Sequence, residues 1–114
     1  MNPSMTTVSN FYEAFGTQNW TKLRSLITDN FSFRGSMASF DNPDDFISAM
    51  SQLPFEGHPE NSKFTADGSR VAHSFVWKMT SPTITDIHMC EVFEVEGDKV
   101  RSSELYYDSA AMPS

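Results

Sequence analysis

Large apolar residues in the first quarter of the chain follow a helical spacing. One set recurs at i, i+3, i+4 and i+7, namely Val8, Phe11, Tyr12 and Phe15. This spacing predicts a helix from about Thr6, and Gly16 suits its end. Asn19 can cap a second helix, whose apolar positions again form one stripe: Trp20, Leu23, Leu26 and Ile27. The two segments therefore indicate a helical hairpin.

Apolar and polar residues alternate from Asp29, which predicts a short strand leading into Gly35. Phe31 and Phe33 share the face of this strand that is expected to meet the core. A third helix is expected from Pro43, because Asn42 or Asp41 can cap it and two aspartates follow in its first turn. Its expected buried stripe is Phe46, Ile47, Met50 and Leu53.

The rest of the chain is typical of strands. Residues 55–60 are expected to form a loop, and residues 61–66 a weak edge strand. Three stronger segments follow at 69–80, 83–96 and 99–108, separated by turn signals, and they predict an antiparallel meander. Helices followed by a sheet indicate an α+β domain in which three N-terminal helices pack on one face of a curved, mostly antiparallel sheet.

Two neighbouring strands each carry one polar residue within an apolar face. His73 interrupts the first face, which otherwise holds Val71, Phe75, Trp77 and Met79. Glu91 interrupts the second, which otherwise holds Ile87, Met89, Phe93 and Val95. A hairpin that turns about Pro82 places His73 directly opposite Glu91. The two exceptions therefore coincide in space.

Such a pair has a chemical and a structural interpretation. Apolar surroundings raise the pKa of a carboxyl group, and an adjacent imidazole can stabilise its charge or share its proton. Glu91 and His73 are therefore candidate catalytic residues for general acid/base chemistry near neutral pH. Alternatively, the two side chains only satisfy each other as a buried polar pair, or a one-residue bulge breaks their alignment.

Other residues are candidates for binding a ligand beside this pair. Arg34 follows the aromatic face of the first strand and can bind an anion or a carbonyl, although a surface salt bridge explains it as well. Either Glu104 and Tyr106 or Leu105 and Tyr107 face inward, depending on the loop at Gly97. The candidate ligand-binding residues are Phe33, Arg34, Phe75, Trp77, Met89, Phe93 and Tyr12.

Charge and composition narrow the class of function. The 114 residues include 15 acidic and 8 basic side chains, a net charge of -7, which disfavours nucleic-acid and membrane-surface partners. The single Cys90 and three dispersed histidines give no metal-site spacing, so neither metal nor cofactor is expected. One domain over 1–114 is expected, ordered over about 5–108 with a mobile tail at 109–114, in a cytoplasmic protein.

The order of these elements and several short segments resemble the SnoaL-like branch of the nuclear transport factor two-like superfamily, which includes ketosteroid isomerase and limonene epoxide hydrolase. The resemblance spans nearly the whole chain. It rests on degenerate patterns at residues 8–15, 19–23, 28–33, 91–100 and 104–108. It implies a cone-shaped roll with a largely apolar pocket, and homodimerisation through the outer face of the sheet, which here carries Ala72, Val76, Cys90 and Val92.

The same resemblance implies a role for Glu91 and limits the reaction. Glu91 matches the carboxyl group with which ketosteroid isomerase binds an oxyanion. The general-base aspartate of that enzyme would fall near Gly35 and its tyrosine near Phe11, with Tyr12 one place away. Steroid isomerisation by that mechanism is therefore not expected, and the residues of an epoxide hydrolase site are not found at matching places.

Two functional hypotheses follow. In the first, the protein binds a small apolar or polyketide-like molecule in its cone, as an isomerase, cyclase or hydrolase that uses Glu91 and His73. In the second, it is a non-catalytic dimerisation or protein-interaction module whose pocket is filled by its own aromatic residues.

Overall fold

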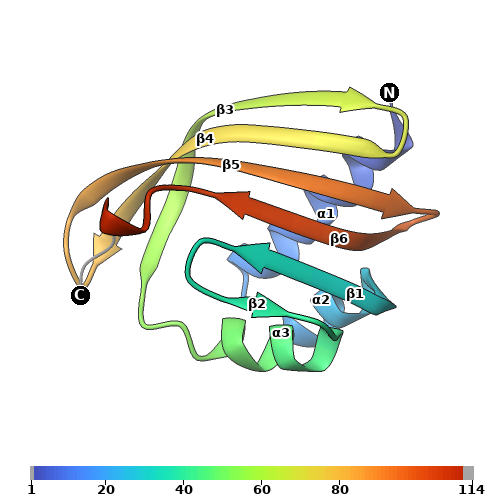
Figure 1. Ribbon diagram of the computed structural model, residues 1–114, viewed down its shortest axis with the longest axis horizontal. Helices are drawn as coiled ribbons and strands as arrows, with labels where there is room; N and C mark the ends of the chain where they lie inside the picture. Colours follow the sequence, from blue (N-terminus) through green and yellow to red (C-terminus); the bar gives the residue numbers. More distant parts are fainter. Residues whose placement is uncertain (1, 112–114) are drawn as a thin grey trace.

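The structure, a computed structural model, describes residues 2–111. Within them the chain forms an α+β fold of three helices and a six-stranded sheet (Figure 1). The helices are α1 (Pro3–Gly16), α2 (Trp20–Ser25) and α3 (Pro43–Ser51), and a 3-10 turn, η1, spans Ser109–Ala111. The strands are β1 (Ile27–Gly35), β2 (Ser39–Phe40), β3 (Glu56–Asp67), β4 (Arg70–Ser81), β5 (Thr85–Glu96) and β6 (Lys99–Tyr106). The last three residues of the predicted tail lie outside the described part.

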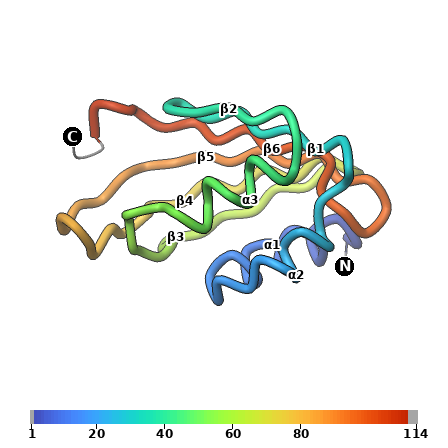
Figure 2. The backbone as a smooth tube through the Cα atoms, turned by 90° about the horizontal axis from the view of Figure 1, so that it is seen from below, coloured from blue at the N-terminus to red at the C-terminus, as the bar shows by residue number. Residues whose placement is uncertain are grey.

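The sheet is mostly antiparallel and has its helices on one side. Its strand order is β2-β1-β6-β5-β4-β3, and β1 runs parallel to β6 while the other neighbours are antiparallel. Helix α1 crosses the back of the sheet behind β4, β5 and β6, and α3 lies beside β1 (Figures 1 and 2). The face turned toward the helices is called the inner face below, and the opposite one the outer face.

Side-chain caps fix the starts of the first two helices. The Asn2 carboxamide accepts a hydrogen bond from the Ser4 amide, so α1 begins at Pro3, earlier than the predicted start. The predicted cap at Asn19 is confirmed. The second helix is shorter than predicted, because Ile27 already belongs to β1, where it pairs with β6.

The third helix begins as predicted and ends earlier. The Asn42 side chain accepts a hydrogen bond from the Asp45 amide at its first turn. Phe46 is buried as expected. Leu53 is instead 43% exposed, because the helix stops at Ser51 and the apolar stripe does not continue beyond that residue.

Strand β3 is longer than the sequence indicated, and the loop predicted over 55–60 is wrong for most of its length. The strand starts at Glu56 and pairs with β4 despite Gly57 and Pro59. It lies at the edge of the sheet, as predicted, and an edge strand tolerates proline because one of its sides has no ladder to complete. A bulge interrupts it between Glu60 and Lys63.

A bulge in β6 decides which residues of the last strand face inward. Val95 pairs with Val100, but Glu94 pairs with Ser102, so β6 contains one extra residue. The extra residue reverses the alternation expected from a two-residue hairpin. After it the odd positions face inward and the even ones outward: Ser103 and Leu105 against Glu104 and Tyr106.

The main core is aromatic and lies between α1, α3 and the β1 side of the sheet. Phe46 of α3 packs against four other rings, those of Phe11, Phe31, Phe33 and Phe40. Leu23, Ile27 and Val100 are fully buried beside them. No helix within residues 2–111 is long and apolar enough to cross a membrane.

Candidate functional site

The predicted register of the β4–β5 hairpin is confirmed. His73 pairs with Glu91, and the neighbouring pairs also agree with a turn about Pro82. Both side chains lie on the inner face, where His73 is 1% exposed and Glu91 is 7% exposed. The sequence pattern therefore located two buried polar residues side by side on one apolar wall.

Two hydroxyl groups hold the Glu91 carboxylate. The Tyr12 hydroxyl of α1 donates to Glu91 Oε1 at 2.6 Å, and the Ser103 hydroxyl of β6 donates to Oε2 at 2.6 Å. Burial raises the pKa of Glu91 above its ordinary value, and the hydrogen bonds from Ser103 and Tyr12 offset part of that rise. The result is an oriented carboxyl group that holds a proton more strongly than an exposed one.

Tyr12 and Ser103 differ in how well the sequence revealed them. Tyr12 was a predicted ligand-binding residue, and its place is the edge of the α1 stripe, where its hydroxyl can reach the sheet. Burial and the negative charge of Glu91 raise its pKa far above the ordinary value, so it stays a donor. Ser103 was missed, because only the bulge in β6 turns it inward. The only feature of the sequence that pointed to Ser103 was the expected burial of Glu91, because a buried carboxylate needs hydrogen-bond donors.

His73 has no comparable partners. Both of its ring nitrogens are buried and lack a hydrogen-bond partner among residues 2–111. Its ring lies between those of Phe64 and Phe75, with centroid distances of 4.1 and 4.2 Å, and meets the Tyr12 ring edge-on at 4.9 Å. Burial lowers the pKa of His73 from 6.5 to about 4, so the imidazole is neutral at physiological pH.

The reciprocal hydrogen bond between His73 and Glu91 is therefore not formed. Glu91 takes its two hydrogen bonds from Tyr12 and Ser103, and Tyr12 touches both members of the pair, one through its hydroxyl and the other through its ring. Phe64 was also missed, because its strand was only weakly indicated. A neutral imidazole in this position can donate one hydrogen bond and accept another.

The other predicted ligand-binding residues divide between two places. Phe75 stacks on His73, and Phe93 meets the Tyr12 ring, so both belong to this wall. Met89 pairs directly with Phe75 beside this wall, and Trp77 lies one step further along the same hairpin, opposite Ile87. Phe33 packs in the aromatic core, and Arg34 is exposed and bonds Asp41 at 2.8 Å, which is the salt bridge considered as its alternative role.

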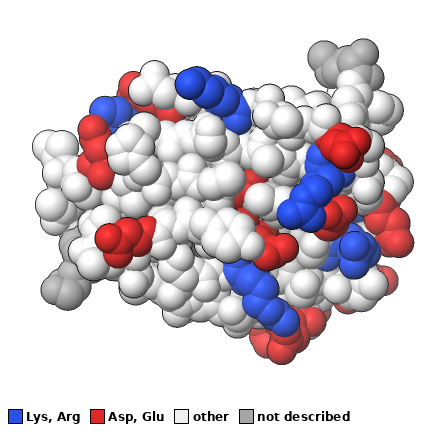
Figure 3. All heavy atoms as spheres, turned by 45° about the horizontal axis from the view of Figure 1, so that its top comes forward, with Lys and Arg blue, Asp and Glu red and all other residues white. Residues whose placement is uncertain are grey.

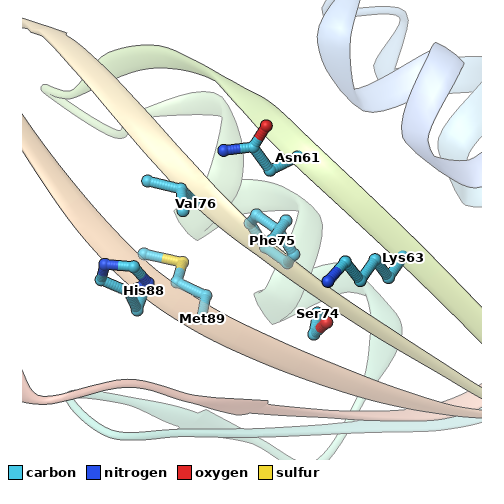
Figure 4. A pocket seen from close by; sticks show the side chains of 7 residues that line it. All are labelled: Asn61, Lys63, Ser74, Phe75, Val76, His88 and Met89. Atoms are coloured by element: carbon cyan, nitrogen blue, oxygen red, sulfur yellow. The ribbon is translucent and has the colours of Figure 1, made fainter.

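Two surface hollows are evident in the described part of the chain, and neither is lined by His73 or Glu91. One, of about 300 Å³, lies over β3, β4 and β5 (Figure 4). The other, of about 240 Å³, includes Arg34 and Tyr106 between β1 and β6. Within residues 2–111 no group of three His, Cys, Asp or Glu side chains is placed to hold a metal ion.

The arrangement of helices and strands is that of the nuclear transport factor two-like (NTF2-like) fold. The chain belongs to the SnoaL-like domain family, which matches residues 8–103. It is similar to an NTF2-like protein of unknown function from Cytophaga hutchinsonii, at 19% identity and a TM-score of 0.81, over 96% of this chain and 94% of that one.

Two further solved structures show how widely the fold is used. An LEH-like epoxide hydrolase from M. tuberculosis is 16% identical with a TM-score of 0.80, over 96% of this chain and 86% of that one. A protein with a ketosteroid isomerase-like fold from Catenulispora acidiphila, in complex with trimethylamine, is 17% identical with a TM-score of 0.79, over 92% and 87%. At these identities the similarity shows the fold alone. No curated protein matches the sequence.

Proposed function

We propose that the protein binds a small, largely apolar molecule carrying a carbonyl or hydroxyl oxygen, and that Glu91 transfers a proton to or from it. The observation that carries this proposal is the buried His73 ring, whose two nitrogens have no partner within residues 2–111. A buried polar group without a hydrogen bond costs about 1–3 kcal/mol. A ligand oxygen bound beside it would remove that cost.

The proposed chemistry divides the work between two side chains. Glu91, held by Tyr12 and Ser103, takes a proton from a carbon next to the ligand carbonyl, and the electron pair of the broken C–H bond moves onto the carbonyl oxygen. A neutral His73 N–H donates a hydrogen bond to that oxygen as its negative charge develops. Glu91 then returns the proton to the same or another atom, which leaves the protein unchanged.

This proton transfer fits several reaction types. Moving a proton from one carbon to another is an isomerisation, and attack of the same enolate on a second carbonyl is a cyclisation. A hydrolase would instead use the Glu91 carboxylate to activate water. Isomerase, cyclase and hydrolase functions therefore share one requirement, a buried carboxyl group with a raised pKa, and Glu91 meets it.

A second candidate function is a binding or interaction module that performs no chemistry. The observation that favours it is the covering of His73 on both ring faces by Phe64 and Phe75. In that case the aromatic side chains of the protein fill the interior. No small apolar compound would then raise the melting temperature.

Exchange of hydrogen for deuterium distinguishes the two candidates without knowledge of the product. Cyclic ketones and β-diketones are incubated with the protein in D₂O, and NMR follows deuterium entering the position next to the carbonyl. We expect accelerated exchange that Glu91→Gln abolishes and His73→Ala strongly reduces, together with a ligand-dependent rise in melting temperature. His58→Ala, at an exposed position of β3, is the matched control and keeps the exchange. Equal exchange in Glu91→Gln and the unchanged protein contradicts the assignment.

We also propose that the protein is a homodimer that associates through the outer face of the sheet. The half-buried residues at the centre of that face are small or aliphatic: Ala72, Val76, Cys90 and Val92. Sedimentation equilibrium at micromolar concentration is expected to give twice the 12.9 kDa chain mass. A single species of the chain mass overturns this proposal.

A further inference from the structure

The 300 Å³ hollow lies on the outer face, opposite the wall that holds His73 and Glu91. Its sides come from three strands, and the residues that line it are Asn61 and Lys63 on β3, Ser74, Phe75 and Val76 on β4, and His88 and Met89 on β5 (Figure 4). Ser74 is exposed and follows the buried His73 directly in the chain, so the two side chains point to opposite faces. The polar side chains of this hollow therefore lie on the other face of the sheet from His73, and Phe75, which stacks on His73, separates the two places.

Four polar side chains line this hollow without partners. The Lys63 ammonium, the His88 imidazole, the Asn61 carboxamide and the Ser74 hydroxyl make no hydrogen bond or ion pair with any residue of the described part. Other basic residues of the same strands are neutralised: Arg70 bonds Glu94, and Lys78 bonds Asp86, at 2.8 and 2.7 Å. On the surface of Figure 3, most basic side chains likewise lie beside acidic ones.

The bulge in β3 creates this arrangement. Glu60 pairs with Val76 and Lys63 pairs with Ser74, so both β3 residues lie on the outer face. Three positions along an unbroken strand would place them on opposite faces. Asn61, in the bulge, has a φ of 54°, a left-handed conformation that is uncommon outside glycine. The strand departs from regular geometry at the place where it brings Lys63 and Asn61 to the hollow.

Nearby acidic groups do not neutralise Lys63. Glu60 lies on the same face one step along β3, but its carboxylate accepts a hydrogen bond from His58 Nε2 at 2.8 Å. Asp86 is held by Lys78. In a chain with a net charge of -7, a lysine without a partner beside three further hydrogen-bonding side chains is an unusual local environment.

We propose that this hollow binds a small organic anion, a carboxylate or phosphate carried on a compact apolar group. An ammonium, an imidazole, a carboxamide and a hydroxyl are the donors that such anions require, and charge-assisted hydrogen bonds are about twice as strong as neutral ones. Val76 supplies an apolar contact for the rest of the ligand. A volume of about 300 Å³ suits a ligand with one ring.

The test titrates the protein with benzoate and with phenyl phosphate, and uses benzamide as the uncharged match. Binding is followed by amide chemical shifts on β3, β4 and β5. We expect both anions to shift these signals and benzamide to leave them unchanged. Lys63→Gln is expected to weaken binding about tenfold, because it removes the charge-assisted bond. Lys22→Gln on α2 removes one exposed charge elsewhere and is expected to leave the affinity unchanged.

Asn61→Gly tests whether the Asn61 carboxamide contributes to anion binding. Glycine accepts the positive φ at this position without strain, so only the carboxamide is lost. We expect a severalfold loss of anion affinity without a change in melting temperature. The preference between benzoate and phenyl phosphate identifies the headgroup of the natural ligand.

Val76 lines the hollow and also belongs to the proposed dimer interface. Sedimentation measured with and without the anion therefore distinguishes anion binding from association of two chains. Anion binding that Lys63→Gln weakens and Lys22→Gln does not weaken supports the proposal at either oligomeric state. Equal losses in the two lysine variants, equal binding of benzamide, or a dimer to which neither anion binds would overturn it.

Discussion

The interior around Phe46 and the interior around His73 differ in polarity. Around Phe46 the interior is apolar, with four aromatic rings against the Phe46 ring and aliphatic side chains beside them. Around His73 the same inner face contains a carboxylate, two hydroxyl groups and an unpartnered imidazole. The first region follows the rule that apolar groups are buried together. The second bears the cost of burying polar groups. Hydrogen bonds among Glu91, Tyr12 and Ser103 offset that cost for these three residues, whereas the His73 nitrogens have no partner in the described part of the chain.

Under the proposed function, this difference separates the part of the fold that supplies stability from the part that binds the ligand. Replacing a residue in the aromatic core should change stability alone. Replacing a residue of the polar wall should change stability less, sometimes in the favourable direction, while it removes binding or activity. Measuring the free energy of unfolding of matched variants therefore tests the difference between the Phe46 region and the His73 region, even before a ligand is identified.

The largest expected effect is in the aromatic core. Phe46→Ala removes a ring that contacts four others and is expected to lower the free energy of unfolding by about 3–5 kcal/mol. Leu53→Ala, just beyond the end of α3 and 43% exposed, is the control, with an expected loss below about 1 kcal/mol. Urea denaturation followed by circular dichroism measures both. Similar losses of unfolding free energy in the two variants would contradict the placement of Phe46 in the core and of Leu53 outside it.

The second effect is a dependence of stability on pH. Because burial lowers the pKa of His73 to about 4, the unfolded chain takes up a proton below pH 6.5 while the folded one does not. Stability from this residue is therefore present above pH 6.5 and is lost as the pH falls toward 4, by up to about 3 kcal/mol. The raised pKa of Glu91 acts in the opposite sense, since its contribution falls as the pH rises above 4.5.

Comparison with a variant isolates the contribution of His73. We expect His73→Gln to flatten the fall in stability between pH 6.5 and 4, and His88→Gln, exposed on the outer face, to retain it. Urea midpoints measured across this range give the slopes. Parallel curves for the unchanged protein and His73→Gln would show that the ring is already charged or solvated in the folded state.

The third effect concerns the hydroxyl groups that hold Glu91. Tyr12→Phe and Ser103→Ala each remove one donor to a buried carboxylate and are expected to cost about 2 kcal/mol. Tyr106→Phe is the matched control, because its hydroxyl also donates to a glutamate, Glu104, but at an exposed position, and its expected cost is below about 0.5 kcal/mol. Equal costs for Tyr12→Phe and Tyr106→Phe would mean that Glu91 is solvated.

The part of the candidate site that depends on strand periodicity could be predicted from the sequence. Alternation and one turn were sufficient to place His73 opposite Glu91, because side chains of an antiparallel pair follow directly from the register. The register did not reveal where the side chains find their partners. The Tyr12 hydroxyl comes from a helix, and Ser103 faces inward only because β6 contains a bulge. Neither feature has a local sequence signal.

The fold shows the same division. Asn19 and Asn42 cap helices where the sequence indicated them, because a cap is a local interaction within one turn. The start of β3 was not predictable, since Gly57 and Pro59 are poor strand residues by their own preference. They form a strand because this segment hydrogen-bonds to β4 at the edge of the sheet, where proline is tolerated. Long-range pairing overrode local preference there.

The smallest expected effect has the opposite sign. His73→Phe replaces an imidazole without partners by a ring of similar shape between Phe64 and Phe75. Because the desolvation cost of two nitrogens disappears while the stacking is retained, the free energy of unfolding is expected to rise by about 1 kcal/mol. Urea denaturation at pH 7 measures it, with Phe75→Leu as a control for the stack. A loss of stability in His73→Phe would show that the nitrogens already have partners in solution and need no ligand oxygen.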